Sequence, residues 1–176
     1  MPVVPRKKHR VRPLVEREKQ QFLQVHIPGR IRLVEQALKR IHSGSRNSYY
    51  DFTVAAVHAR VLAQFLGLKL SKTGNLVRDT EYYPHEANDS YEVKLPDVCD
   101  RPLLDPSTFT TQDRRALQIG FDTINREVAH FTWFDKKPRH HSSDSPTANY
   151  YTNLVNRLAK FCEIILRETR RNVPGI

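Results

Sequence analysis

The stretch INREVAHFTW, residues 124–133, carries polar side chains inside a run that is otherwise apolar. Asp122, Arg126 and His130 recur every four residues and would share one face of a helix, with Asn125 on the neighbouring stripe. A guanidinium makes bidentate contacts with phosphate, and an imidazole gains or loses a proton near neutral pH. This polar set therefore has the chemistry that binding a phosphate and transferring a proton require.

A second polar pair lies in the most apolar segment of the chain, within the sequence VHARVLAQFL. His58 shares a predicted helix face with apolar neighbours, and Arg60 lies two residues further on. A buried imidazole without a hydrogen bond costs about 1 to 3 kcal/mol, so His58 needs a partner. If the two helices are antiparallel neighbours, His58 and Arg60 join the polar set around His130 in one cationic pocket.

The same residues also allow a purely structural interpretation. Asp122 and Arg126 are spaced as an ordinary i, i+4 ion pair, and His58 and His130 can be core histidines that bond to the backbone. Buried polar networks fix packing more often than they catalyse. Composition and spacing leave both interpretations open.

Periodicity predicts that helices carry both polar groups. From Pro13 a modest helix runs to Pro28 and Gly29, where we expect the chain to stop or break before a second helix follows. The segment around His58 has almost no polar face, which is typical of the central helix of a bundle, and Gly67 is expected to end it.

Two further helices complete the predicted core. One opens at Thr111, and the other follows Thr147 with an apolar face opposite a charged one. The first has an apolar stripe at spacings of four and three residues, made of Leu117, Phe121, Ile124, Val128 and Phe131. No alternating strand of useful length appears. The predicted fold class is therefore all-α, an irregular bundle of four to five helices.

The chain divides into one domain and two tails. We expect a flexible basic arm over residues 1–12, a single helical domain over 13–171 and a C-terminal tail over 172–176. Within the domain, residues 71–110 show neither period and form a long excursion between the central helices. This excursion is acidic, because residues 79–105 hold eight acids against two bases.

The net charge favours polyanionic partners. The chain has 29 lysines and arginines against 19 aspartates and glutamates, a formal charge of +10. A charge of this sign attracts RNA or another polyanion through counterion release. No apolar run reaches the roughly 18 residues of a membrane span, and the N-terminus lacks an apolar signal core. We therefore expect no membrane partner and a cytoplasmic location.

No metal or other cofactor is expected. Cys99 and Cys162 lie in unrelated contexts and indicate neither a disulfide nor a cysteine zinc site. His140 and His141 could supply metal ligands, but adjacent histidines in a loop rich in serine and proline are usually solvated.

Two segments resemble the HEPN superfamily of small helical bundles. NREVAH is similar to the asparagine-centred, histidine-ending form of its motif. VHARVLAQFL, with HIPGRIRLVEQALKRI before it, is similar to the earlier helices of a HEPN-like group of uncharacterised bacterial proteins. The likeness covers residues 26–134. Many HEPN proteins are metal-independent ribonucleases that use an arginine and a histidine, and Arg126 lies closer to His130 than that superfamily's usual spacing.

The resemblance implies a function directed at RNA. His130 would be the proton-transfer group, Arg126 or Arg60 the phosphate clamp, and Asn125 the residue that orients the histidine or the phosphate, with His58 in support. The implied activity is RNA binding, with metal-independent cleavage if the pocket is active, in a bacterial defence or toxin system. HEPN proteins are commonly dimeric, so a homodimer is a possible assembly. The alternative is a noncatalytic helical interaction module with a buried polar network and a basic surface for nucleic acid or protein.

Overall fold

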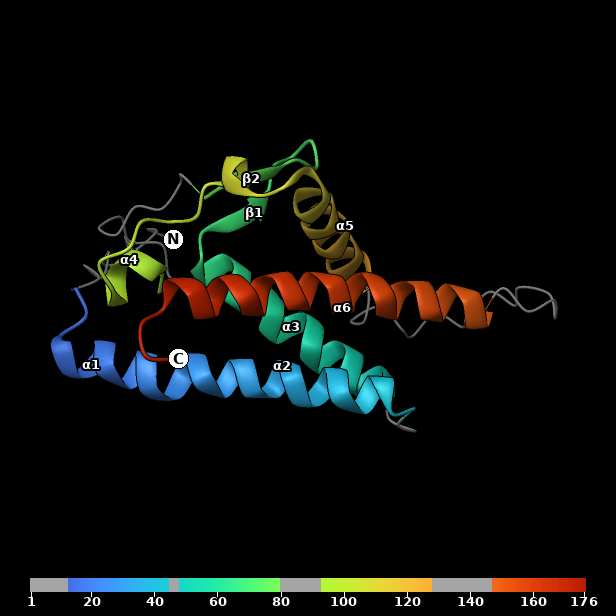
Figure 1. Ribbon diagram of the computed structural model, residues 1–176, viewed down its shortest axis with the longest axis horizontal. Helices are drawn as coiled ribbons and strands as arrows, with labels where there is room; N and C mark the ends of the chain where they lie inside the picture. The colour runs from blue at the N-terminus through green and yellow to red at the C-terminus, as the bar shows by residue number, and fades with distance from the viewer. Residues whose placement is uncertain (1–12, 45–47, 80–92, 128–146) are drawn as a thin grey trace, which may run out of the picture.

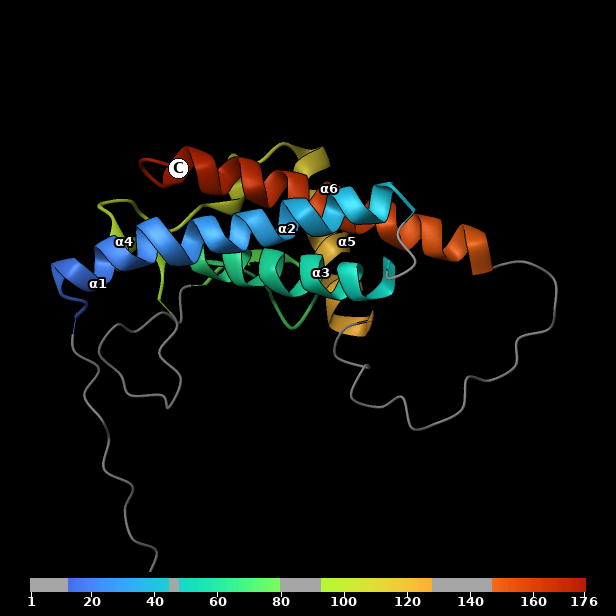
Figure 2. The same ribbon diagram turned by 90° about the horizontal axis from the view of Figure 1, so that it is seen from below.

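The computed structural model describes residues 13–44, 48–79, 93–127 and 147–176. These residues form an irregular helical bundle with one small sheet, which confirms the predicted all-α class (Figure 1). Helices α2 (Ile27–His42) and α6 (Thr147–Asn172) lie side by side and run in opposite directions, and α3 (Ser48–Phe65) packs against both (Figures 1 and 2). In the described parts of the chain, no helix is both long and apolar enough to cross a membrane.

The first helical rod continues through Pro28, where we expected a stop or a break. It consists of α1 (Glu16–Gln21), a π-helical turn (Phe22–His26) and α2 (Ile27–His42). Proline has no N–H, so the α-helical bond from Pro28 to Gln24 cannot form. The π turn bonds the Ile27 N–H to the Phe22 carbonyl instead, and Pro28 lies in the first turn of α2, where a missing N–H does little harm.

Helix α3 (Ser48–Phe65) ends where the sequence predicted. Gly67 has a φ of 81° and donates its N–H to the Gln64 carbonyl over 2.9 Å, as expected of a glycine that ends a helix. A Cβ at Gly67 would lie 2.7 Å from Leu103, so only glycine fits this position. At the other end, Asp51 is 2% exposed and pairs with Arg40 over 3.3 Å, which links the first turn of α3 to the last turn of α2.

A short β-hairpin follows α3, although the sequence predicted no strand of useful length. Strands β1 (Leu68–Leu70) and β2 (Leu76–Arg78) pair antiparallel, with Leu70 opposite Leu76. The Ser71 N–H donates to the Asn75 carbonyl and Gly74 has a φ of 80°, the geometry of a tight hairpin with a bulge. Three residues per strand are too few to show alternation in the sequence.

The rest of the predicted excursion, as far as it is described, lies against the bundle. It contains α4 (Leu95–Val98) and a 3-10 turn (Pro106–Thr108). Its acids pair with nearby cations, as Asp79 does with Lys69 over 2.8 Å and with Lys94 over 3.1 Å. Lys94 is buried and also donates to the Gln64 carbonyl over 3.1 Å. The excursion is therefore attached to the end of α3.

Helix α5 (Thr111–Glu127) packs mainly against α6 (Thr147–Asn172) and makes only a small contact with α3. Gly120 brings α5 close to Phe161 of α6, and Phe161 meets Phe121 edge to face with ring centroids 5.0 Å apart. The predicted stripe of α5 is confirmed at Leu117, Phe121 and Ile124, all at most 3% exposed. Val128 and Phe131, the other two members of that stripe, lie outside the described residues.

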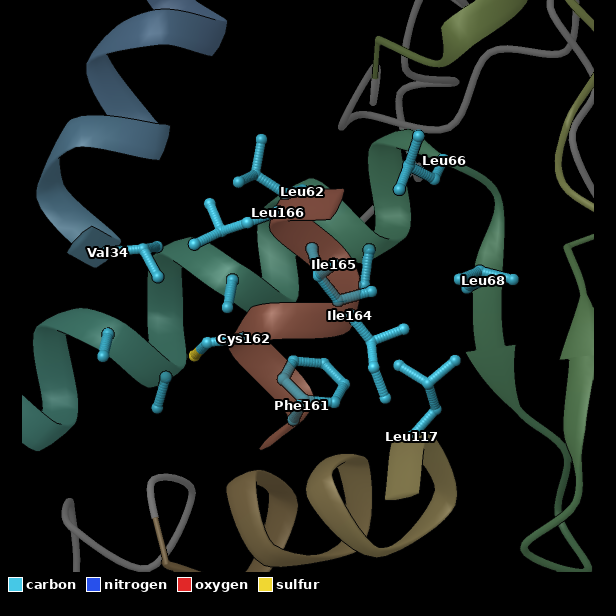
Figure 3. Close-up of a cluster of buried hydrophobic side chains, with 14 of the residues drawn as sticks. Val34, Leu62, Leu66, Leu68, Leu117, Phe161, Cys162, Ile164, Ile165 and Leu166 are labelled. Atoms are coloured by element: carbon cyan, nitrogen blue, oxygen red, sulfur yellow. The ribbon is translucent and has the colours of Figure 1, made fainter. Parts of the chain in front are cut away.

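The hydrophobic core forms where α2, α3, α5, α6 and β1 meet (Figure 3). Helix α6 contributes the largest share of the labelled side chains, on the face that its sequence predicted. The labelled residues are Val34, Leu62, Leu66, Leu68, Leu117, Phe161, Cys162, Ile164, Ile165 and Leu166. This core fixes α2 and α3 against each other, and the candidate site lies between these two helices.

Candidate functional site

A hydrogen bond between Arg30 of α2 and His58 of α3 gives His58 its partner. Arg30 Nη1 lies 3.0 Å from His58 Nδ1. A guanidinium can only donate, so the Nδ1 atom accepts and the imidazole is neutral with its proton on Nε2. Burial and the neighbouring charge of Arg30 lower the pKa of His58 below its ordinary value. A histidine that stays neutral near pH 7 can hold this arginine without adding a second positive charge.

Arg30 also forms part of the wall of a pocket between the first rod and α3. The pocket has a volume of about 280 Å³ and is partly open to solvent. Its walls are mostly apolar and include two aromatic rings, Phe22 and Phe65, whose centroids lie 5.7 Å apart. The polar residues among its lining are Arg30 and Gln64.

The π-helical turn shapes this wall. In an α-helix, residues four apart lie one above the other. Here the Ile27 N–H bonds to the Phe22 carbonyl, so residues five apart are stacked and both Phe22 and Ile27 line the pocket. Turns of this kind occur frequently at functional sites.

Arg30 has no carboxylate within ion-pair distance among the residues that the structure describes. Six other described arginines do have one: Arg40, Arg78, Arg126, Arg167, Arg170 and Arg171 pair with an aspartate or a glutamate. The charge of Arg30 is therefore not neutralised, although the residue is partly buried in a pocket wall. A guanidinium in this situation gains most from an anionic ligand.

The residues predicted on the later helix are placed only in part. Arg126 pairs with Asp122, with Nε 2.9 Å from Oδ1, and the two side chains are 72% and 53% exposed. This confirms the ordinary i, i+4 ion pair that the spacing allowed. Asn125 is partly buried on α5, and His130 lies outside the described residues. That Asn125, Arg126 and His130 lie close to His58 and Arg60 stays a prediction.

Sequence reasoning found His58 but missed Arg30. It sought the partner of His58 on the later helix, whereas α3 packs much more extensively on α2 than on α5. One available signal was the pattern HIPGRIR, in which Arg30 shares a helix face with Ile27 and Ile31, next to the core. The pattern places Arg30 next to the core only if the helix continues through Pro28.

Among the described residues, no group of three or more histidine, cysteine, aspartate or glutamate side chains is placed to hold a metal ion. His140 and His141 lie outside these residues. Searches of protein-family models, of curated proteins and of solved structures found no match to the chain. The resemblance to HEPN proteins therefore stays a prediction, and the site has to be interpreted from its own geometry.

Proposed function

We propose that this protein binds RNA and that Arg30 is the phosphate contact at its site. The observation that carries the proposal is the charge of Arg30, which is partly buried beside a pocket and faces a neutral imidazole instead of a carboxylate. The net charge of +10 supplies the long-range attraction that brings a polyanion to such a contact.

His58 has a positioning role in this proposal. Its hydrogen bond holds one arm of the Arg30 guanidinium, which leaves the other N–H groups for a ligand. An arginine held in place loses less side-chain freedom when it binds a phosphate. The pair therefore favours a specific anion contact over loose attraction to the surface.

Replacing Arg30 by alanine tests the proposal. We expect Arg30→Ala to weaken binding of a fluorescently labelled single-stranded RNA about tenfold, because one charge-assisted hydrogen-bonding group is lost. The slope of log affinity against log salt should fall by about one. Fluorescence anisotropy over a series of salt concentrations measures both quantities.

Arg157→Ala is the matched control, because it removes the same charge from an exposed position on α6. It should reduce affinity only slightly. Equal losses for the two variants would show that net charge alone attracts RNA and would remove Arg30 from the site. No binding of RNA by the unaltered protein would refute the proposed function itself.

RNA cleavage by a HEPN-like mechanism is an additional part of the proposal. It assigns proton transfer to His130, the phosphate clamp to Arg126 or Arg60, and an orienting role to Asn125. We expect His130→Ala to abolish cleavage of RNA in the absence of metal ions while the circular dichroism spectrum stays unchanged. Cleavage at the rate of the unaltered protein would exclude His130 from the mechanism.

A noncatalytic interaction module is the second candidate, and the Asp122–Arg126 ion pair favours it. A guanidinium paired with a carboxylate at 2.9 Å is already neutralised and is a weaker phosphate clamp. Under this interpretation the protein cleaves no RNA, and His130→Ala lowers the melting temperature without changing RNA affinity. The same variant therefore separates the two candidates.

A further inference from the structure

We propose that the pocket beside Arg30 holds one unstacked base of a single-stranded RNA, with the adjoining phosphate on the Arg30 guanidinium. This inference rests on the proposed function and specifies its ligand. It follows from three features of the same pocket: its size, its aromatic wall and its two polar residues, Arg30 and Gln64.

The size of the pocket suits a small planar group. Pockets for drug-sized ligands span roughly 300 to 1,000 Å³, and this one, at about 280 Å³, falls just below that range. A single base fits such a space, and because the pocket is partly open, the rest of the nucleotide can lie outside it. A base pair within a duplex cannot enter, so the ligand must be single-stranded or locally unpaired.

The aromatic wall supplies a surface for a base. Phe22 and Phe65 line the pocket, but Phe65 is only 3% exposed and packs against Phe22. The ring surface that a base can reach is therefore that of the partly buried Phe22 and of the exposed His26, whose rings lie 5.4 Å apart. Contact between a base and aromatic side chains is a main source of affinity for single strands and tolerates every base. An apolar wall without rings would not offer this interaction.

Gln64 supplies a group that can read a base edge. Its backbone carbonyl accepts from Lys94 and from Gly67, which fixes this last turn of α3. Gln64 is one of the residues that line the pocket, and its side-chain amide has no hydrogen-bond partner among the described residues. An amide donates and accepts at once, as the edge of a base does. The pocket thus combines a phosphate contact, an aromatic wall and an edge contact within one nucleotide's reach.

An abasic substitution in the RNA tests the inference. The probe is a labelled RNA of about eight nucleotides, compared with the same chain of ribose and phosphate in which all bases are removed. We expect the unaltered protein to bind the complete RNA about tenfold more tightly than the abasic chain, because contact between bases and aromatic side chains is lost. Arg30→Ala should weaken the binding of both probes.

Two pairs of variants locate the effect in the pocket. Phe22→Leu keeps an apolar side chain but removes the ring, and Gln64→Leu removes the amide; both should reduce the preference for the complete RNA at least threefold. The controls are Phe109→Leu, a buried ring outside the pocket, and Gln118→Leu, a partly buried amide on α5. Melting curves of all four variants identify any that lose the fold. If Phe22→Leu or its control Phe109→Leu unfolds, the comparison of Gln64→Leu with Gln118→Leu still tests the inference.

The outcomes separate this inference from the function on which it rests. If the protein binds neither probe, the proposed function fails. If it binds both probes equally, or if the pocket variants keep the full preference for bases, RNA binding stands and the base pocket is wrong.

Discussion

Two glycines in helices of this protein have opposite surroundings. Gly120 of α5 faces Phe161, and a Cβ at this position would overlap that ring. Gly29 of α2 has no atom within 4 Å of the place where a Cβ would lie. The sequence cannot distinguish the two, because both are single glycines in helical patterns.

We expect Gly120→Ala to destabilise the protein and Gly29→Ala to stabilise it. Alanine favours a helix by about 1 kcal/mol over glycine. At Gly120 the overlap with a fully buried ring should outweigh this gain and leave a net loss of about 1 to 3 kcal/mol. At Gly29 the added methyl group meets no other atom, so the full gain in helix stability of about 1 kcal/mol should remain. Urea denaturation of the two variants measures both signs, and a stabilised Gly120→Ala protein would contradict the close approach of α5 to α6.

At the residue scale, the sequence predicted which side chains are buried better than which ones meet. The burial of Leu117, Phe121 and Ile124 follows from helical spacing, and the structure confirms it. The partner of His58 does not follow from spacing, because a contact between helices depends on how the helices pack. Arg30 and His58 are 28 residues apart, and only the packing of α2 on α3 brings them together.

Three elements are joined by the ion pair of Asp79 and Lys94. Asp79 follows β2, Lys94 precedes α4, and Lys94 also reaches the last turn of α3 through the Gln64 carbonyl. Burial alone would raise the pKa of Asp79, but hydrogen bonds from Lys69 and Lys94 and the charges of both lysines outweigh it and lower the pKa. The ionised carboxylate is thus stabilised by the folded state.

This pKa shift predicts how stability depends on pH. Asp79 loses its proton at lower pH in the folded chain than in the unfolded chain, so its contribution is complete above the unfolded pKa of about 3.9. The contribution is lost as the pH falls through the lower folded pKa. Asp79→Asn should therefore cost about 1 to 3 kcal/mol at pH 7, and the difference from the unaltered protein should shrink below about pH 4.

Asp100→Asn is the control, because Asp100 is exposed on the same segment. Thermal melting from pH 7 down to pH 3 compares the three proteins. A deficit for Asp79→Asn that stays constant down to pH 3 would show that the carboxylate charge is not what joins these elements.

At the element scale, long periodic helices could be predicted and short elements could not. The end of α3 at Gly67 and the apolar face of α6 are confirmed. The hairpin was missed, because strands of three residues leave no period and their turn resembles any polar loop. The continuation of the first rod was missed because Pro28 normally ends a helix, and only the π turn before it allows the helix to continue.

Over the whole molecule, helical periodicity predicted the fold class, and composition set the sign of the net charge. The all-α bundle is confirmed, and the polyanionic partner that the net charge of +10 favours stays a prediction. The site required the structure, because its pocket is built from the rod, from α3 and from Val93, and none of these segments indicates a pocket by itself. The base pocket and the phosphate contact at Arg30 are proposals that this arrangement supports.

The π turn at Phe22–His26 also has a consequence for how this chain tolerates changes in length. A π turn is equivalent to one residue inserted into an α-helix. Removing one residue there would place Pro28 in the interior of an α-helix, where its missing N–H and its ring disturb the turn before it. The deletion would also rotate everything before it, including α1, about the axis of the rod. Phe22 and Ile27 would then no longer stack, and the pocket would lose one wall. A single-residue deletion in the rod would thus remove one wall of the site and kink or break the rod at Pro28.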